Sequence, residues 1–219
     1  MAEIKKFTFN PLSENTYLVF DESREAVVVD PGFYFESERS EFFSFVQEKG
    51  LILKAVLLTH GHIDHITGIK DIVDKYGVPV YMNSGDEDTL RRFNKSAAAL
   101  IDMTEYSTEF ETKDAPDGLI VHFGGIDIKV LTTPGHSPGS VCWHISGERI
   151  LFTGDTLFAG TIGRTDFPFS SLDSLLEGLR TKILPLDGDT VILPGHGGES
   201  SIGKERVTNP FITGEPELS

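Results

Sequence analysis

The chain has 219 residues, and 19 Lys+Arg against 34 Asp+Glu give a formal net charge of −15. So acidic a protein repels phosphate backbones and anionic lipids, so we expect neither nucleic acid nor a membrane as a partner. The composition, 39% hydrophobic and 24% charged, is that of a folded globule, and the length suits a single domain over residues 1–219. One cysteine excludes an intramolecular disulfide. Without a signal-like or membrane-spanning segment, the expected location is the cytoplasm.

The first half of the chain alternates short apolar runs with helical stripes. A mostly apolar run ending at Leu58 has the pattern of a strand covered on both faces. The next stripe has spacings of three and four and ends at Gly77, which predicts a capped helix and an α/β crossover to the following strand. The predicted elements are strands at 17–20 and 26–29, a helix at 41–48 ended by Gly50, a strand at 53–58, a helix at 66–76 and a strand at 78–82.

The second half contains a further group of strands. The pair Gly124-Gly125 lies between two apolar runs and predicts a hairpin turn. The expected elements are a helix at 86–102, a polar loop at 105–117, hairpin strands at 119–123 and 126–131, strands at 141–145 and 149–153, a helix at 172–183, a strand at 190–193 and a polar tail from 197. Two strand clusters, each followed by helices, favour two sheets packed face to face with helices outside over a doubly wound sheet, although periodicity alone does not decide between them.

The segment Thr59-His60-Gly61-His62-Ile63-Asp64-His65 places four metal-competent side chains within six residues. Imidazole and carboxylate groups suit zinc, and also iron or manganese. His60 and His62 are two residues apart in a turn after a buried strand, so they point the same way. Asp64 and His65 lie near the start of the next helix, where adjacent residues diverge by about 100°. Two neighbouring metal positions use all four groups, one pair for each ion.

Further ligands are expected in other loops at strand ends. His136 and His196 follow apolar strands and are flanked by Gly and Pro, and Asp155 lies just past another strand. His122 and His144 lie inside strand patterns and are expected to be ordinary strand residues.

These motifs resemble the metallo-β-lactamase superfamily over nearly the whole chain, from about Asn15 to Pro210. The resemblance implies an αββα sandwich of two mixed sheets with helices on the outer faces. It also implies two divalent ions, most simply zinc. The implied ligands are His60, His62 and His136 for the first ion and Asp64, His65 and His196 for the second, with Asp155 bridging both. Asp64 and Asp155 are also the candidate catalytic carboxylates.

Within the superfamily, the chain resembles the glyoxalase II group, the hydroxyacylglutathione hydrolases, on Thr133-Pro134-Gly135-His136-Ser137, Gly163-Arg164-Thr165-Asp166 and the tail 202–211. That tail is similar to the short bacterial members, so no added C-terminal helical domain is expected. The resemblance implies hydrolysis of a small thioester, with glutathione as one candidate thiol. The two ions would lower the pKa of a bridging water, whose hydroxide attacks the carbonyl. A thiolate leaving group needs no general acid, since the pKa of a thiol is about 8.5.

Other functions compete with this hypothesis. The chain also resembles persulfide dioxygenases of the same superfamily, which would hold one iron on His60, His136 and Asp155. A β-lactamase is disfavoured by the tail, and a nuclease by the net charge. A metal-binding module without catalysis would predict damaged ligands, and all seven are intact.

Several other side chains have two interpretations each. Arg164 is the first candidate to bind an anionic substrate, with Lys204 and Arg206 as further candidates, or it forms a salt bridge that holds its loop. Asp30 either orients the metal ligands or is a simple turn residue. Cys142 is expected in the core rather than as a catalytic thiol. Core burial is also the preferred interpretation of three phenylalanines that could instead line a groove: Phe158, Phe167 and Phe169.

Overall fold

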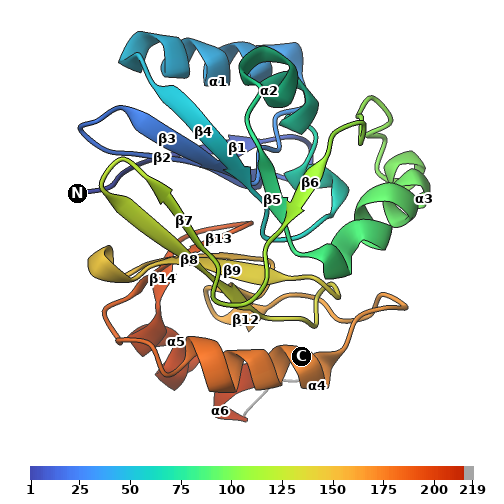
Figure 1. The fold of residues 1–219 in the computed structure, drawn as a ribbon. Helices are drawn as coiled ribbons and strands as arrows, with labels where there is room; N and C mark the ends of the chain where they lie inside the picture. Colours follow the sequence, from blue (N-terminus) through green and yellow to red (C-terminus); the bar gives the residue numbers. More distant parts are fainter. Residues whose placement is uncertain (215–219) are drawn as a thin grey trace.

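Among residues 1–214, twelve strands form two sheets that stack face to face, and the short strands β11 (Leu157–Phe158) and β12 (Thr161–Ile162) pair in a separate two-stranded sheet. The first sheet comprises β1 (Glu3–Phe9), β2 (Glu14–Phe20), β3 (Glu25–Val29), β4 (Ile52–Leu57), β5 (Val80–Met82) and β6 (Thr112–Asp114) in that order. The second comprises β14 (Ser200–Ser201), β13 (Val191–Pro194), β10 (Ile150–Gly154), β9 (Val141–Ile145), β8 (Ile126–Thr132) and β7 (Ile120–Phe123) in that order. A computed structural model, in which residues 1–214 are described, shows this arrangement (Figure 1).

Both sheets are mixed, as the resemblance predicts. In the first sheet, β1, β2 and β3 pair antiparallel, whereas β3 to β6 pair parallel. In the second, only the β10–β13 pair is parallel. The crossover predicted after residue 58 is confirmed, because β4 and β5 are parallel and a helix connects them.

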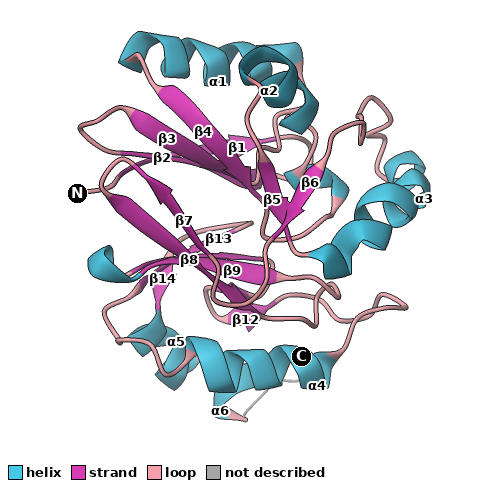
Figure 2. Cartoon of the chain, viewed as in Figure 1, coloured by secondary structure: helices cyan, strands magenta, loops and turns pink. Residues whose placement is uncertain are grey.

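Helices cover the outer face of each sheet, so the fold is the predicted αββα sandwich (Figure 2). Both faces of the first sheet are covered because successive side chains of a strand point to opposite faces. In β2, Leu18 packs against the helices, whereas Val19 packs between the two sheets. Helix α1 supplies Phe42 and helix α2 supplies Ile72 to the first outer layer. The helices are α1 (Glu36–Lys49), α2 (Ile69–Tyr76), α3 (Asn94–Leu100), α4 (Leu172–Gly178), α5 (Ile202–Thr208) and α6 (Pro210–Thr213).

Most predicted elements are confirmed, and both predicted helix-ending glycines, Gly50 and Gly77, adopt the left-handed conformation of a C-cap. The sequence did not reveal β1 and β6, nor the short strands β11, β12 and β14, and helices α5 and α6 lie in the segment that was expected to be a polar tail. The first two are edge strands, where polar residues are tolerated and blur the alternation. Helix α5 buries the carboxylate of Glu205, which apolar periodicity does not detect. Among residues 1–214, each helix is too short or too polar to cross a bilayer.

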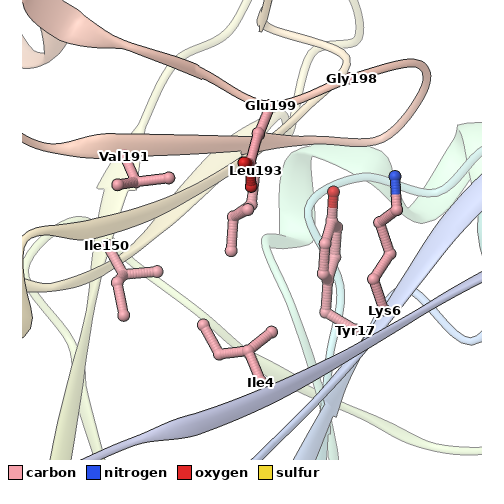
Figure 3. A pocket seen from close by; sticks show the side chains of 8 residues that line it. All are labelled: Ile4, Lys6, Tyr17, Ile150, Val191, Leu193, Gly198 and Glu199. Carbon is pink, nitrogen blue, oxygen red and sulfur yellow. The ribbon is translucent and has the colours of Figure 1, made fainter.

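A crevice of about 570 Å³ opens at one side of the sandwich, between β1–β2 and β10–β13. Figure 3 shows its lining, which is mainly apolar, with Lys6 and Glu199 as its charged side chains. The hydroxyl of Tyr17, one of the lining residues, donates a hydrogen bond to the carbonyl oxygen of Pro194 at 2.7 Å. The crevice therefore lies behind the loop that carries His196, and it does not coincide with the histidine cluster.

Candidate metal centre

The histidine-rich segment follows β4 as predicted. His60 and His62 lie in the loop after the strand, and Ile63–His65 forms one 3-10 turn. Helix α2 begins only at Ile69, so Asp64 and His65 precede the helix rather than occupying its first turn. All four metal-competent side chains of the segment are buried, although Asp64 and the imidazoles are polar. Burial of so many polar groups in one loop requires partners for them.

The loops after β4, β8, β10 and β13 converge beside the interface between the sheets. They bring together two groups of three side chains, and within each group the ligand atoms all lie within 4.8 Å of one another. The first group is His60, His62 and His136, and the second is Asp64, His65 and His196. A third overlapping combination consists of Asp30, His60 and His65.

Asp155 lies between the two groups. Its Oδ1 atom is 3.5 Å from His65 Nε2 and 3.8 Å from His196 Nε2. Its Oδ2 atom is 3.6 Å from His136 Nε2. One carboxylate thus turns one oxygen toward each group, which is the arrangement that a bridging ligand needs.

The polar atoms of the cluster fit divalent metal ions. Within residues 1–214, the Nε2 atoms of His60 and His65 and Oδ1 of Asp155 are buried without a hydrogen-bond partner. Each such atom costs about 1–3 kcal/mol unless something satisfies it. The Nε2 atom of His136 lies 2.9 Å from Nδ1 of His62. Two nitrogen ligands about 2.1 Å from one zinc ion are separated by roughly 3.3 Å, so small adjustments suffice for both to bind it.

Burial and charge set the protonation of the cluster. Burial lowers the pKa of His60 well below its ordinary value and that of His62 to about 3, so both imidazoles are neutral and free to bind a cation. Burial opposes the charge on His65 as well, but Asp64, Asp155 and Asp30 together outweigh it and raise its pKa. In return, His65 and His196 outweigh burial at Asp64 and lower the pKa of that carboxyl.

Asp30 makes the orienting contacts that the sequence left undecided. Its Oδ2 atom lies 3.0 Å from His65 Nδ1, so the opposite nitrogen of the ring faces the cluster. Asp30 also accepts hydrogen bonds from the backbone N–H and the hydroxyl of Thr59. Its backbone is left-handed, with φ of 47°. Asp30 is therefore more than a turn residue.

Comparison with known proteins agrees with this geometry. Residues 9–196 match the family model described as Metallo-beta-lactamase superfamily. The chain belongs to this superfamily. It is 32% identical to hydroxyacylglutathione hydrolase GloC of Haemophilus influenzae over 200 residues, covering 91% of this chain and 92% of GloC.

Two solved structures of metallo-beta-lactamase relatives have the same architecture. BLEG-1 B3 metallo-beta-lactamase has a TM-score of 0.87 and 32% identity, covering 96% of this chain and all (100%) of that one. TTHA1623 in a di-iron-bound form has a TM-score of 0.84 and 34% identity, covering 94% of this chain and 99% of that one. The family match, the similarity to a hydrolase over nearly the whole chain and the histidine-rich clusters together support a metal-binding, hydrolase-like enzyme of this superfamily.

Sequence reasoning missed Asp86, which connects two of the loops that carry the metal-competent residues. Its buried carboxylate accepts hydrogen bonds from the N–H of Gly61 at 2.7 Å, the N–H of Gly139 at 2.6 Å and the hydroxyl of Ser137 at 2.7 Å. The first bond holds the loop of His60 and His62, and the other two hold the loop of His136. Burial raises the pKa of Asp86. The only signal in the sequence was an acidic residue at the start of a predicted helix.

Three other missed residues lie against the loops that carry Asp64, His65 and His196. The side-chain amide of Asn10 donates to the carbonyl oxygen of Asp64, and that of Asn15 donates to the carbonyl oxygen of Pro194. Glu14 is fully buried 3.9 Å from His65 Nδ1, and burial raises its pKa. Each contact joins segments far apart in the chain.

The preferred interpretation of Phe158, Phe167 and Phe169 as core residues is wrong. All three are half-buried, and their rings border the histidine cluster. The loop after Gly163 passes over the site, so its aromatic rings reach the histidines rather than the layers between helices and sheets. Their short apolar run gave no indication of that path.

The remaining predicted residues have ordinary surroundings. Arg164 forms a two-bonded ion pair with Asp166, at 2.7 and 2.8 Å, which is the structural alternative for this residue. Arg206 donates to the carbonyl oxygen of Leu184. Cys142 is buried in the predicted core, and burial raises the pKa of its thiol to about 11. The predicted strand residues are confirmed, with His122 in β7 and His144 in β9.

Proposed function

We propose that the chain is a dinuclear metal-dependent hydrolase of small thioesters. The observation that carries the proposal is the presence of two complete three-residue groups with one carboxylate between them. When bound, two adjacent divalent ions lower the pKa of a shared water and polarise the carbonyl oxygen of an ester. Zinc suits the set of nitrogen and carboxylate donors, and iron and manganese are the other candidates.

In this proposal each residue has a defined task. His60, His62 and His136 would hold the first ion, Asp64, His65 and His196 would hold the second, and Asp155 would be available to both. Asp30 fixes the His65 ring by binding its Nδ1 nitrogen. The carbonyl oxygen of Arg164 accepts a hydrogen bond from His136 Nδ1 at 2.9 Å and fixes that ring in the same way.

A thioester is the proposed substrate because its cleavage does not require a general acid from the protein. A thiol has a pKa of about 8.5, so its thiolate leaves without a dedicated acid. The similarity to hydroxyacylglutathione hydrolase GloC supports an acyl group carried on glutathione or on another small thiol. Arg164 stays the candidate for an anionic part of the substrate, provided that it exchanges its partner Asp166 for the substrate.

The alternative is a persulfide dioxygenase with a single iron on His60, His136 and Asp155. Such a site has no use for a second complete group, yet Asp64, His65 and His196 lie close enough together to bind an ion. Their convergence favours the dinuclear hydrolase.

Two measurements test the proposal. Elemental mass spectrometry of gently purified protein should find two ions per chain, and one iron per chain would favour the dioxygenase. Asp155→Ala should remain folded but lose nearly all hydrolysis of S-lactoylglutathione by the metal-loaded protein. Asp127→Ala is the matched control, because Asp127 is exposed and pairs with His122 away from the cluster. Full activity in Asp155→Ala would refute the dinuclear mechanism.

A further inference from the structure

Three phenylalanine rings form a wall beside the proposed first metal position. We define the aromatic wall as Phe93, Phe167 and Phe169. The ring centroids of Phe93 and Phe167 lie 5.5 and 5.3 Å from that of His62, and Phe169 lies 6.3 Å away. Phe167 also lies 6.1 Å from His136. The wall thus meets two of the three histidines of the first group.

The wall is assembled from two segments far apart in the chain. Phe93 ends the π-helical segment Thr89–Phe93 just before α3, whereas Phe167 and Phe169 belong to the loop before α4. Both segments lie on the same side of the sandwich (Figure 1). The rings touch one another, with centroids 5.2 Å apart for Phe93 and Phe167 and 4.9 Å for Phe93 and Phe169.

Structural packing alone does not explain these rings. All three are only half-buried and remain open to solvent, and, within the described part of the chain, none of them belongs to a hydrophobic cluster of the sandwich or packs against one. Exposed apolar side chains that cluster at a polar site are typical of a ligand-binding surface. On the outer side of the wall, Phe93 and Phe169 line a cleft of about 480 Å³ together with Pro138 and Pro168.

The charges around the wall are already paired. The guanidinium of Arg164 lies 4.4 Å above the Phe167 ring and is held by Asp166. At the rim of the cleft, Arg92 pairs with Asp88 at 3.2 Å. A charged or strongly polar group on the wall would have to break one of these pairs, whereas an apolar group would gain contact with the rings at no such cost.

We propose that the aromatic wall binds the acyl group of the substrate and selects aromatic or medium-chain acyl groups over small hydroxyacyl groups. This inference rests on the proposed thioester hydrolysis and adds its substrate class. A substrate carbonyl beside His62 and His136 places its acyl chain against Phe167 and Phe93. Each fully buried methylene contributes about 0.8 kcal/mol, which is about fourfold in kcat/KM. Two such methylenes give more than a tenfold preference.

The test uses thioesters of one thiol, N-acetylcysteamine, with acetyl, lactoyl, hexanoyl and phenylacetyl groups. For each ester, kcat/KM of the metal-loaded protein is divided by the rate constant of its hydrolysis by hydroxide, which removes differences in intrinsic reactivity. We expect this normalised kcat/KM to be at least tenfold higher for the hexanoyl and phenylacetyl esters than for the acetyl and lactoyl esters. Phe93→Ala and Phe167→Ala should each reduce this ratio severalfold. Phe211→Ala is the matched control, because Phe211 is a partly exposed phenylalanine on α6, and it should leave the ratio unchanged.

The outcomes separate this inference from the proposed function. A flat acyl dependence, a preference for lactoyl, or an equal loss for all four esters in Phe93→Ala would overturn the acyl-binding role while leaving the hydrolase intact. If no thioester is cleaved, the proposed function fails, and calorimetry of product binding still decides the role of the wall. Phenylacetate should bind wild-type protein more tightly than lactate does, and Phe93→Ala should remove the difference. Equal binding of the two acids by the wild type would overturn the inference.

Discussion

Replacing Asp86 by alanine is expected to destabilise both loops of the proposed first metal position at once. The carboxylate is fully buried and satisfies two backbone N–H groups, those of Gly61 and Gly139. It also accepts from the hydroxyl of Ser137, which has a second partner in Ser140. Alanine would therefore leave two buried donors without partners, while the hydroxyl keeps one.

The expected loss follows from these hydrogen bonds. An unsatisfied buried donor costs about 1–3 kcal/mol, so two donors cost about 2–6 kcal/mol. Removing the carboxylate also removes the desolvation penalty that raises its pKa, which offsets part of that cost. We expect Asp86→Ala to lower the free energy of unfolding of the metal-free protein by about 2–4 kcal/mol. Asp86→Asn keeps one acceptor oxygen and should lose less.

Urea unfolding of metal-free protein measures this loss, and zinc titration supplies a second readout. Because the two supported loops carry His60, His62 and His136, zinc affinity should fall about 10–100-fold. Asp88→Ala is the matched control, since Asp88 is highly exposed and pairs only at the surface, and it should change stability by less than about 0.5 kcal/mol. A loss below about 1 kcal/mol with unchanged zinc affinity in Asp86→Ala would refute the organising role.

Three further results are expected. Gly154→Ala should destabilise the protein by more than about 2 kcal/mol in urea, because a Cβ there meets the Thr59 side chain and φ is +48°, whereas the unobstructed Gly147→Ala should be nearly neutral; equal losses would contradict this. Cys142 should resist a thiol reagent at pH 8 until urea unfolds the chain. Because burial raises its folded pKa to about 11, its stabilising contribution is complete below pH 9 and disappears as pH rises through 11. Cys142→Ala should therefore lose less stability than the wild type between pH 9 and 11, and an equal loss in the two proteins would contradict this. Chelation should lower the melting temperature and zinc should restore it, since the partnerless Nε2 atoms of His60 and His65 then bind a metal ion again; an unchanged melting temperature would argue against metal binding.

Periodicity predicted most of the elements because it records which face of an element is buried, whereas the αββα layers were predicted from the order of the elements and the family resemblance. Strand β8 alternates, β2 contains an apolar run that is buried on both faces, and the stripe of α2 has helical spacing, so both types of element were recognised. Helix α5 was missed because the carboxylate of Glu205 fills its buried face and accepts hydrogen bonds from Gly160 N and Asn209 Nδ2. A polar side chain gives no hydrophobic signal even when it is fully buried.

The metal-competent residues could be predicted from the sequence because histidine and aspartate are recognisable as possible metal ligands from their residue type alone. Four of them are adjacent in the chain, and His136, Asp155 and His196 end strands at glycine-rich loops. Their convergence into two groups with Asp155 between them is a property of the sandwich, in which four strand ends meet.

Only the tertiary structure decided what surrounds those residues. Asp86 supports loops 25 and 53 residues away in sequence, and Phe93 meets Phe167 from another segment of the chain. The Asp86 carboxylate binds backbone N–H groups, and every residue type other than proline has such a group. Its partners are therefore decided by the path of the backbone and cannot be recognised from a residue pattern. The residue type of a phenylalanine likewise does not show whether its ring packs in the core or belongs to the aromatic wall beside the histidines. Its place was fixed by how the loop before α4 crosses the end of the sandwich.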